Sequence, residues 1–93
     1  MRRIGIIGVG LLGSAVATRL LQRGFEVIGY DTRATQVEAL HPQGLGAAAS
    51  VAEAAAEADA VFTILPTLDS VEAVVYGPRG AKGAPARFFA MVE

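Results

Sequence analysis

Three closely spaced glycines, Gly8, Gly10 and Gly13, stand between a short apolar run and a segment with helical periodicity. Their spacing fits G-x-G-x-x-G, which is a weak signal alone because short motifs match by chance. Here the motif follows a predicted strand and opens a predicted helix, and Asp31 comes 18 positions after Gly13 at the end of the next predicted strand. This context predicts a binding site for the phosphates of a dinucleotide.

Each glycine has its own expected role. Gly8 permits a tight turn, Gly10 lets the backbone approach a pyrophosphate, and Gly13 allows the helix to pack closely on the strand. Free amides at the helix start, together with the positive end of the helix dipole, would hold the anion without a lysine. The alternative is a tight strand-to-helix turn in a domain that binds no nucleotide.

Asp31 is the candidate for contact with the adenosine ribose. A carboxylate at this strand end can accept hydrogen bonds from both ribose hydroxyls and would repel a 2'-phosphate. The alternative is a solvated turn aspartate or a cap for the next helix. Arg33 complicates the choice of cofactor, because its guanidinium can pair with a 2'-phosphate or stack on adenine. We favour NAD over NADP, since an acid at this position usually selects the free hydroxyl.

Leu65, Pro66 and Thr67 follow the fourth predicted strand, where ligands of doubly wound sheets bind. Pro66 either stiffens a wall against the dinucleotide or only ends the strand. His41 is interpreted as an exposed helix-end residue, because no acid or nucleophile is placed to orient it. The sequence shows no catalytic constellation, and one histidine without any cysteine predicts no metal site.

Strands alternate with helices along the chain. Apolar runs predict strands over residues 3–7, 25–30, 44–48 and 58–65. Helical patterns cover residues 11–23, 35–40, 50–57 and 69–75, the third of these opening with a capping box formed by Ser50 and Glu53. Residues 87–92 are consistent with a fifth strand, a short helix or a frayed end. The alternation predicts an α/β fold with parallel strands joined by right-handed helical crossovers.

The composition is typical of one globular domain. Of 93 residues, 53% are hydrophobic and 18% charged, and the net charge of -1 comes without a basic stripe that would suit nucleic acid. The basic start at Arg2 and Arg3 and the apolar run after it imitate a secretory leader. Glycines would weaken such a leader helix, and the run is too short to span a bilayer. We therefore expect a soluble, unprocessed, cytoplasmic protein without membrane contact.

Four stretches resemble the amino-terminal cofactor domain of the β-hydroxyacid dehydrogenases, the group of the 3-hydroxyisobutyrate, tartronate semialdehyde and 6-phosphogluconate dehydrogenases. They are "IGIIGVGLLGSAVATRLLQRG", "VIGYDTR", "GAAASVAEAAAEADAVFTILP" and "VEAVVYGPRG", which lie within residues 3–80. The resemblance implies a Rossmann domain that binds NAD(P), with a doubly wound parallel sheet of strand order 3-2-1-4. The residues it implies around the cofactor are Gly8, Gly10, Leu11, Leu12 and Gly13 at the pyrophosphate, Asp31 with Thr32 or Arg33 at the adenosine ribose, and Leu65 and Pro66 along the dinucleotide. Leu12 stands where the family usually has methionine.

We expect a dinucleotide-binding domain over residues 1–80 and a Gly/Pro/Ala-rich tail over residues 81–93. The family's serine-glycine-glycine substrate segment, its catalytic lysine and its helical second domain would all lie beyond Glu93. The resemblance thus implies the cofactor domain of a hydride-transferring oxidoreductase, present as a fragment. The alternatives are a nucleotide-binding or regulatory module without catalysis, or a decayed reading frame.

The fourth predicted strand raises a question of solubility. If the chain ends without a strand beside it, a long apolar edge is exposed. We then expect self-association through this edge or poor solubility, unless residues 87–92 cover it.

Overall fold

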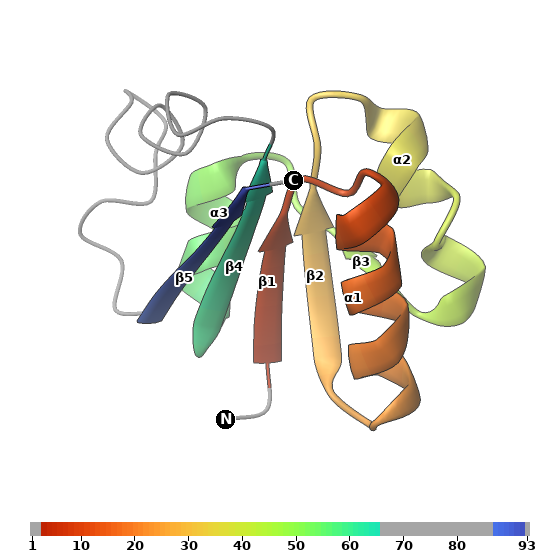
Figure 1. Cartoon of the computed structure of the whole chain (residues 1–93), viewed down its shortest axis with the longest axis horizontal. Coiled ribbons are helices and arrows are strands. Elements are labelled where there is room, and N and C mark those ends of the chain that lie inside the picture. Colours follow the sequence, from red (N-terminus) through yellow and green to blue (C-terminus); the bar gives the residue numbers. More distant parts are fainter. Residues whose placement is uncertain (1–2, 66–86, 93) are drawn as a thin grey trace.

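The computed structural model describes residues 3–65 and the strand at residues 87–92 (Figure 1). Its five strands form one sheet in the order β3-β2-β1-β4-β5, and all the pairings are parallel. The strands are β1 (Arg3–Ile7), β2 (Glu26–Tyr30), β3 (Gly46–Ala47), β4 (Ala60–Leu65) and β5 (Arg87–Val92). The helices are α1 (Leu11–Gln22), α2 (Ala34–Glu38), the 3-10 helix η1 (His41–Gln43) and α3 (Val51–Glu57). The predicted fold class and the order 3-2-1-4 are confirmed.

A fifth strand extends the predicted sheet. β5 pairs with β4 along its whole length, from Ala60 opposite Arg87 to Leu65 opposite Val92. The edge of β4 that we expected to be exposed is therefore covered, and β5 forms the edge on that side. The condition under which we expected self-association through this edge is therefore not met. The predicted helical turns at residues 69–75 and the expected domain boundary near residue 80 lie outside the described residues.

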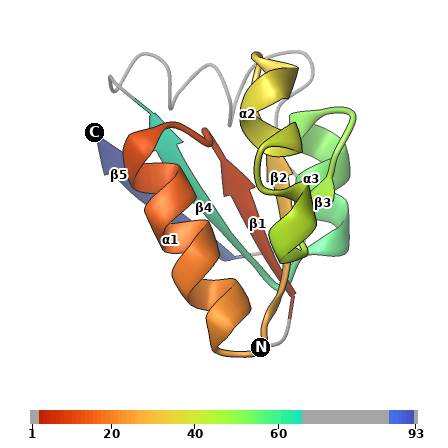
Figure 2. The ribbon, with the colours of Figure 1, turned by 90° about the vertical axis from the view of Figure 1, so that its right-hand side faces the viewer.

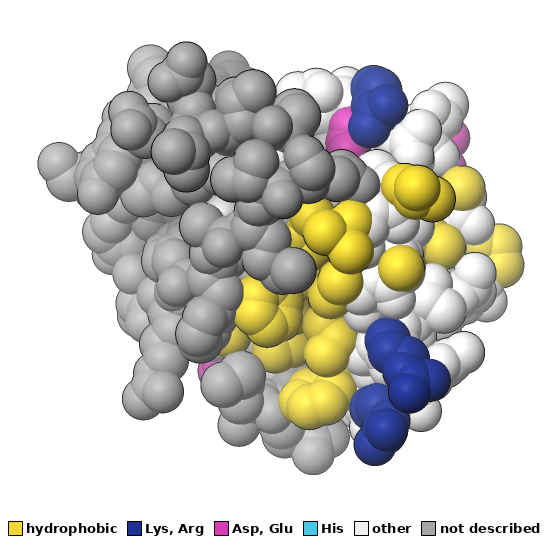
Figure 3. All heavy atoms as spheres, in the orientation of Figure 1, with side chains coloured by type: hydrophobic (Ala, Val, Ile, Leu, Met, Phe, Trp, Pro, Cys, Tyr) yellow, Lys and Arg dark blue, Asp and Glu magenta, His cyan; other side chains and the backbone are white. Residues whose placement is uncertain are grey.

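Helices lie on both faces of the sheet, with α1 on one face and α3 on the other (Figure 2). Side chains of β1 pack on both faces of the sheet. Ile4 and Ile6 belong to the core under α1, whereas Ile7 belongs to the core under α3. Burial on both faces explains why this strand reads as a nearly continuous apolar run. The core under α1 is the larger one, and hydrophobic side chains also gather on the surface of that side (Figure 3).

Sequence signals near the ends of the elements predicted most of the element boundaries. Glu53 N donates to Ser50 Oγ at 3.1 Å, so the predicted cap of α3 forms, and Ala49 N donates in return to Glu53 Oε1 at 3.0 Å. Two elements are shorter than the sequence predicted. α2 ends at Glu38, before a separate 3-10 turn that carries a proline in its first positions, and β3 has only two residues.

No helix among the described residues has the length and apolar character that a membrane crossing requires.

Candidate dinucleotide-binding site

The turn between β1 and α1 requires glycine at two positions. Gly8 has a φ of +97°, which L-residues rarely adopt, and its amide donates to Tyr30 O at 2.8 Å. A Cβ atom on Gly8 would collide with the carbonyl oxygen of Ile64, and one on Gly13 would collide with the carbonyl oxygen of Gly8. Both glycines therefore bring the turn close to its neighbours, as their spacing predicted.

Among the described residues, no side chain caps the start of α1. Gly10 is the N-cap residue, and neither a capping side chain nor an acidic residue occupies the first turn. Within α1 the first backbone bond runs from Ser14 N to Gly10 O at 2.8 Å, and the amides of Leu11 and Gly13 come too early in the helix to reach a helical acceptor. The helix has 12 residues, enough for a full macrodipole. Backbone amides and dipole together suit a diphosphate.

Gly10 differs from the other two glycines of the motif. Its φ of -84° and ψ of -152° are extended values that other residues adopt, so its conformation does not demand glycine. The expected reason for glycine here, close approach of a pyrophosphate, remains a prediction.

Asp31 lies directly after β2 and accepts three hydrogen bonds. Its Oδ2 accepts from Val9 N at 2.8 Å, and its Oδ1 accepts from Arg33 N at 2.8 Å and from Arg33 Nε at 3.3 Å. The Asp31 side chain is 6% exposed, whereas that of Arg33 is 62% exposed. The bond to Arg33 N agrees with the alternative reading of a turn aspartate, and the bond to Val9 was not anticipated.

These contacts set the acidity of Asp31. Burial, the largest influence, raises the pKa of the carboxyl, but the amides of Arg33 and Val9 and the Arg33 guanidinium together outweigh it, and the pKa is lowered. The site therefore presents a charged carboxylate at neutral pH.

Four predicted cofactor residues, Gly8, Asp31, Thr32 and Leu65, line one hollow of about 70 Å³. It lies where β1, β2 and β4 end, the position at which doubly wound sheets bind their ligands. Leu12 packs instead against the core under α1, while Leu11, 89% exposed, begins the helix. Pro66 lies outside the described residues.

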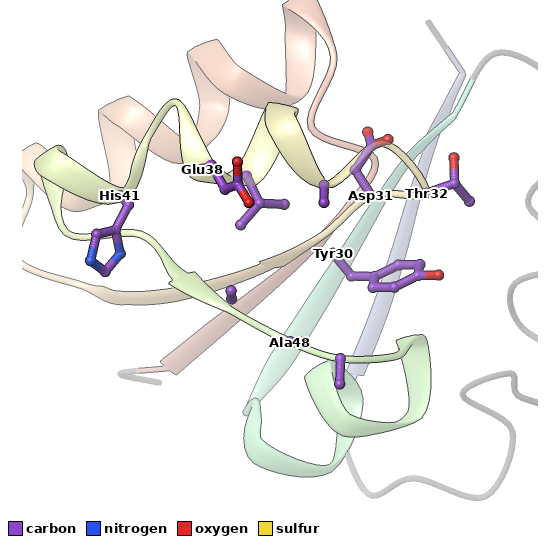
Figure 4. A pocket seen from close by; sticks show the side chains of 10 residues that line it. Tyr30, Asp31, Thr32, Glu38, His41 and Ala48 are labelled. Carbon is purple, nitrogen blue, oxygen red and sulfur yellow. The ribbon is translucent and has the colours of Figure 1, made fainter.

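A larger cavity of about 400 Å³ opens beside the hollow, and Tyr30, Asp31 and Thr32 form part of its wall (Figure 4). Glu38 and His41 line it from the α2 side, and residues 47–49 line it from the end of β3 and the segment that follows. The sequence did not predict this cavity, although three consecutive alanines at the end of a predicted strand were a signal, because small side chains leave room. His41 is exposed at a helix end, as expected, and its Nδ1 lies 3.4 Å from Leu45 O.

The described residues thus combine a helix start without a side-chain cap, a charged carboxylate at the adjacent strand end and a largely apolar cavity. Within residues 3–65 and 87–92 no three His, Cys, Asp or Glu side chains gather in a way that would hold a metal ion. Fold and site together define a dinucleotide-binding α/β domain of the Rossmann class.

Comparison with known proteins narrows this class. Residues 3–87 match the family model for the NAD binding domain of 6-phosphogluconate dehydrogenase. The chain belongs to this family of NAD-binding domains, and the resemblance seen in the sequence is confirmed.

Curated relatives are oxidoreductases of greater length. The chain is 39% identical over 80 residues to 3-sulfolactaldehyde reductase of Escherichia coli, and 38% identical over 82 residues to 2-(hydroxymethyl)glutarate dehydrogenase of Eubacterium barkeri. These matches include 86% and 88% of the chain, but the chain spans only 27% of the length of either relative.

Solved structures share the fold. An imine reductase from Myxococcus stipitatus in complex with NADP+ superimposes with a TM-score of 0.90 at 18% identity, over 97% of this chain and 32% of that one. An imine reductase from Streptomyces aurantiacus superimposes with a TM-score of 0.87 at 27% identity, over 98% of this chain and 32% of that one.

Proposed function

We propose that this chain is the cofactor domain of an oxidoreductase that transfers hydride between a nicotinamide dinucleotide and a small β-hydroxyacid, with NAD preferred over NADP. Membership of the NAD-binding family supports the cofactor, and the names of the curated relatives support the class of reaction. The observation that carries the proposal is the uncapped start of α1 beside the buried carboxylate of Asp31.

Each part of the site has a proposed share in binding. The amides of Gly10, Leu11 and Gly13 would hold the diphosphate, with Leu12 in the same helical turn. Asp31, Thr32 and Arg33 would contact the adenosine ribose, and the cavity of about 400 Å³ offers an apolar recess for adenine. Leu65 and Pro66 would lie along the dinucleotide toward the nicotinamide.

When bound, the nicotinamide ring supplies the chemistry by accepting or giving a hydride. The residues of this chain bind and orient the cofactor, and no proton-transfer step is assigned to them.

The preference for NAD is argued from charge. The Asp31 carboxylate is negative, 6% exposed and fixed by two backbone amides, so it would repel a 2'-phosphate at close range. Arg33 is the opposing group, but its guanidinium already contacts Asp31, 3.3 Å from Nε to Oδ1. A phosphate would have to compete with this pairing.

Calorimetry of the chain with NADH and with NADPH tests cofactor binding and choice. We expect saturable binding of both, at least tenfold tighter for NADH, and a smaller difference in Asp31→Ala. Equal or reversed affinities in the wild-type chain would contradict the preference, and no binding of either would contradict the proposed function.

A chimaera tests the reaction class. Residues 3–87 would replace the matching segment of the E. coli 3-sulfolactaldehyde reductase, and we expect NADH-dependent reduction to persist. A folded chimaera that binds NADH without turnover would favour the alternative of a binding or regulatory module.

We also place the protein in the cytoplasm, since a chain without cysteine suits a reducing compartment. Cell fractionation checks this placement.

A further inference from the structure

We infer that Asp31 is a positioning residue, which holds the glycine turn in its diphosphate-binding shape before any nucleotide arrives. This inference rests on the proposed function and adds a second role to a residue expected only to contact ribose.

The turn is tied to the end of β2 by two successive amides. Gly8 N donates to the backbone oxygen of Tyr30, and Val9 N donates to the side chain of Asp31, each at 2.8 Å. The second bond is well shielded from water, because Val9 is 0% exposed and the Asp31 side chain only 6% exposed. A shielded bond to a charged acceptor is stronger than an exposed neutral one.

The two oxygens of the carboxylate serve different loops. Oδ2 binds Val9 in the turn after β1, and Oδ1 binds the amide of Arg33 in the loop after β2. Asp31 therefore bridges the segment expected to hold the diphosphate and the segment expected to hold the ribose. Only a carboxylate accepts at both oxygens, since one end of an asparagine amide is a donor.

The hydrogen bond from Val9 N to Asp31 Oδ2 holds the residue directly before Gly10, the N-cap of α1. Fixing Val9 thereby limits the conformations from which the amides of α1 meet an anion. Preorganisation of this kind raises affinity because the ordering cost is met on folding rather than on binding. A residue that contacts ribose alone would have no such effect on a ligand without ribose hydroxyls.

Two probes separate the roles: ADP, and 2',3'-dideoxy-ADP, which keeps the diphosphate but lacks both hydroxyls. In Asp31→Ala we expect at least a tenfold loss of affinity for both probes, and a smaller loss in Asp31→Asn, which keeps one acceptor. Glu57→Gln, an exposed acidic position on α3, is the matched control and should bind like the wild type. A loss confined to ADP would overturn the inference in favour of ribose contact alone.

Amide hydrogen exchange in the nucleotide-free chain tests the Val9–Asp31 hydrogen bond directly. We expect the Val9 amide to exchange at least tenfold faster in Asp31→Ala than in the wild type. Ala48 N, which donates to Gly29 O at 2.9 Å, should keep its protection and thus reports an intact fold. Unchanged exchange at Val9 would overturn the inference. This measurement needs no nucleotide, so it decides the role of Asp31 even if the wild-type chain binds neither NADH nor ADP.

Discussion

The Oδ2 atom of Asp31 lies 2.8 Å from the amide nitrogen of Val9, although the two residues are 22 positions apart in the chain. Parallel pairing of β1 with β2 places their carboxyl ends side by side, Ile7 opposite Tyr30, and so brings the residues that follow together. The glycine turn and the acid are therefore parts of one structural unit, and several predictions about stability and binding depend on it.

Acid should destabilise the fold partly through Asp31. The pKa of this carboxyl is lowered from its ordinary 3.8, so the folded state binds fewer protons than the unfolded state near that pH. The resulting stability is fully present above the ordinary pKa and is lost as pH falls through the lowered value. We expect unfolding free energy to fall less steeply from about pH 5 to pH 2 in Asp31→Asn than in the wild type or Glu57→Gln. Urea titrations across this range measure it, and parallel profiles would contradict the expectation.

Gly8→Ala should be more destabilising than Gly24→Ala. Both glycines have positive φ, +97° and +88°, so each substitution incurs a conformational cost of about 1–2 kcal/mol. A Cβ on Gly24 meets nothing within 4 Å, whereas one on Gly8 collides with the carbonyl oxygen of Ile64. Chemical denaturation measures both variants, and equal losses would show that the space around Gly8 adjusts freely.

Gly13→Ala should lower stability although alanine is the better helix former by about 1 kcal/mol. The added methyl collides with the carbonyl oxygen of Gly8, and α1 must move away from the turn. Thr18→Ala, in the same helix, supplies the gain in propensity without this collision and serves as the control. An increase in melting temperature for Gly13→Ala would refute the proposed close packing.

Ser50→Ala should cost about 1 kcal/mol, since its Oγ accepts the amide of Glu53 at the start of α3. For a domain of this size the melting temperature should fall by roughly 4–8 °C. Thr35→Ala removes a hydroxyl from an exposed position of α2 and should change stability by less than about 0.5 kcal/mol. Indistinguishable melting curves for the two variants would argue against the cap.

The sequence predicted the features that rest on local chemistry. Glycine spacing located the β1–α1 turn, and the strand end located Asp31. The unpredicted features depend on tertiary contacts: the rotamer that aims Asp31 at Val9, and the cavity walled by residues 47–49. For residues 87–92 the sequence left a strand, a short helix and a frayed end open. The strand depends on pairing with β4, which joins residues far apart in the chain. No local pattern encodes such a long-range pairing.

The central claim is that the backbone at the start of α1 binds the diphosphate of the cofactor, and the affinity of Gly10→Val for NADH tests it most directly. The φ of Gly10 is negative, so a side chain there needs no left-handed backbone, and a retained circular dichroism spectrum and melting transition would show that the variant folds. We expect at least a tenfold weaker affinity by calorimetry, because the side chain would occupy the space of the phosphates. Wild-type affinity in a folded Gly10→Val sample would contradict it.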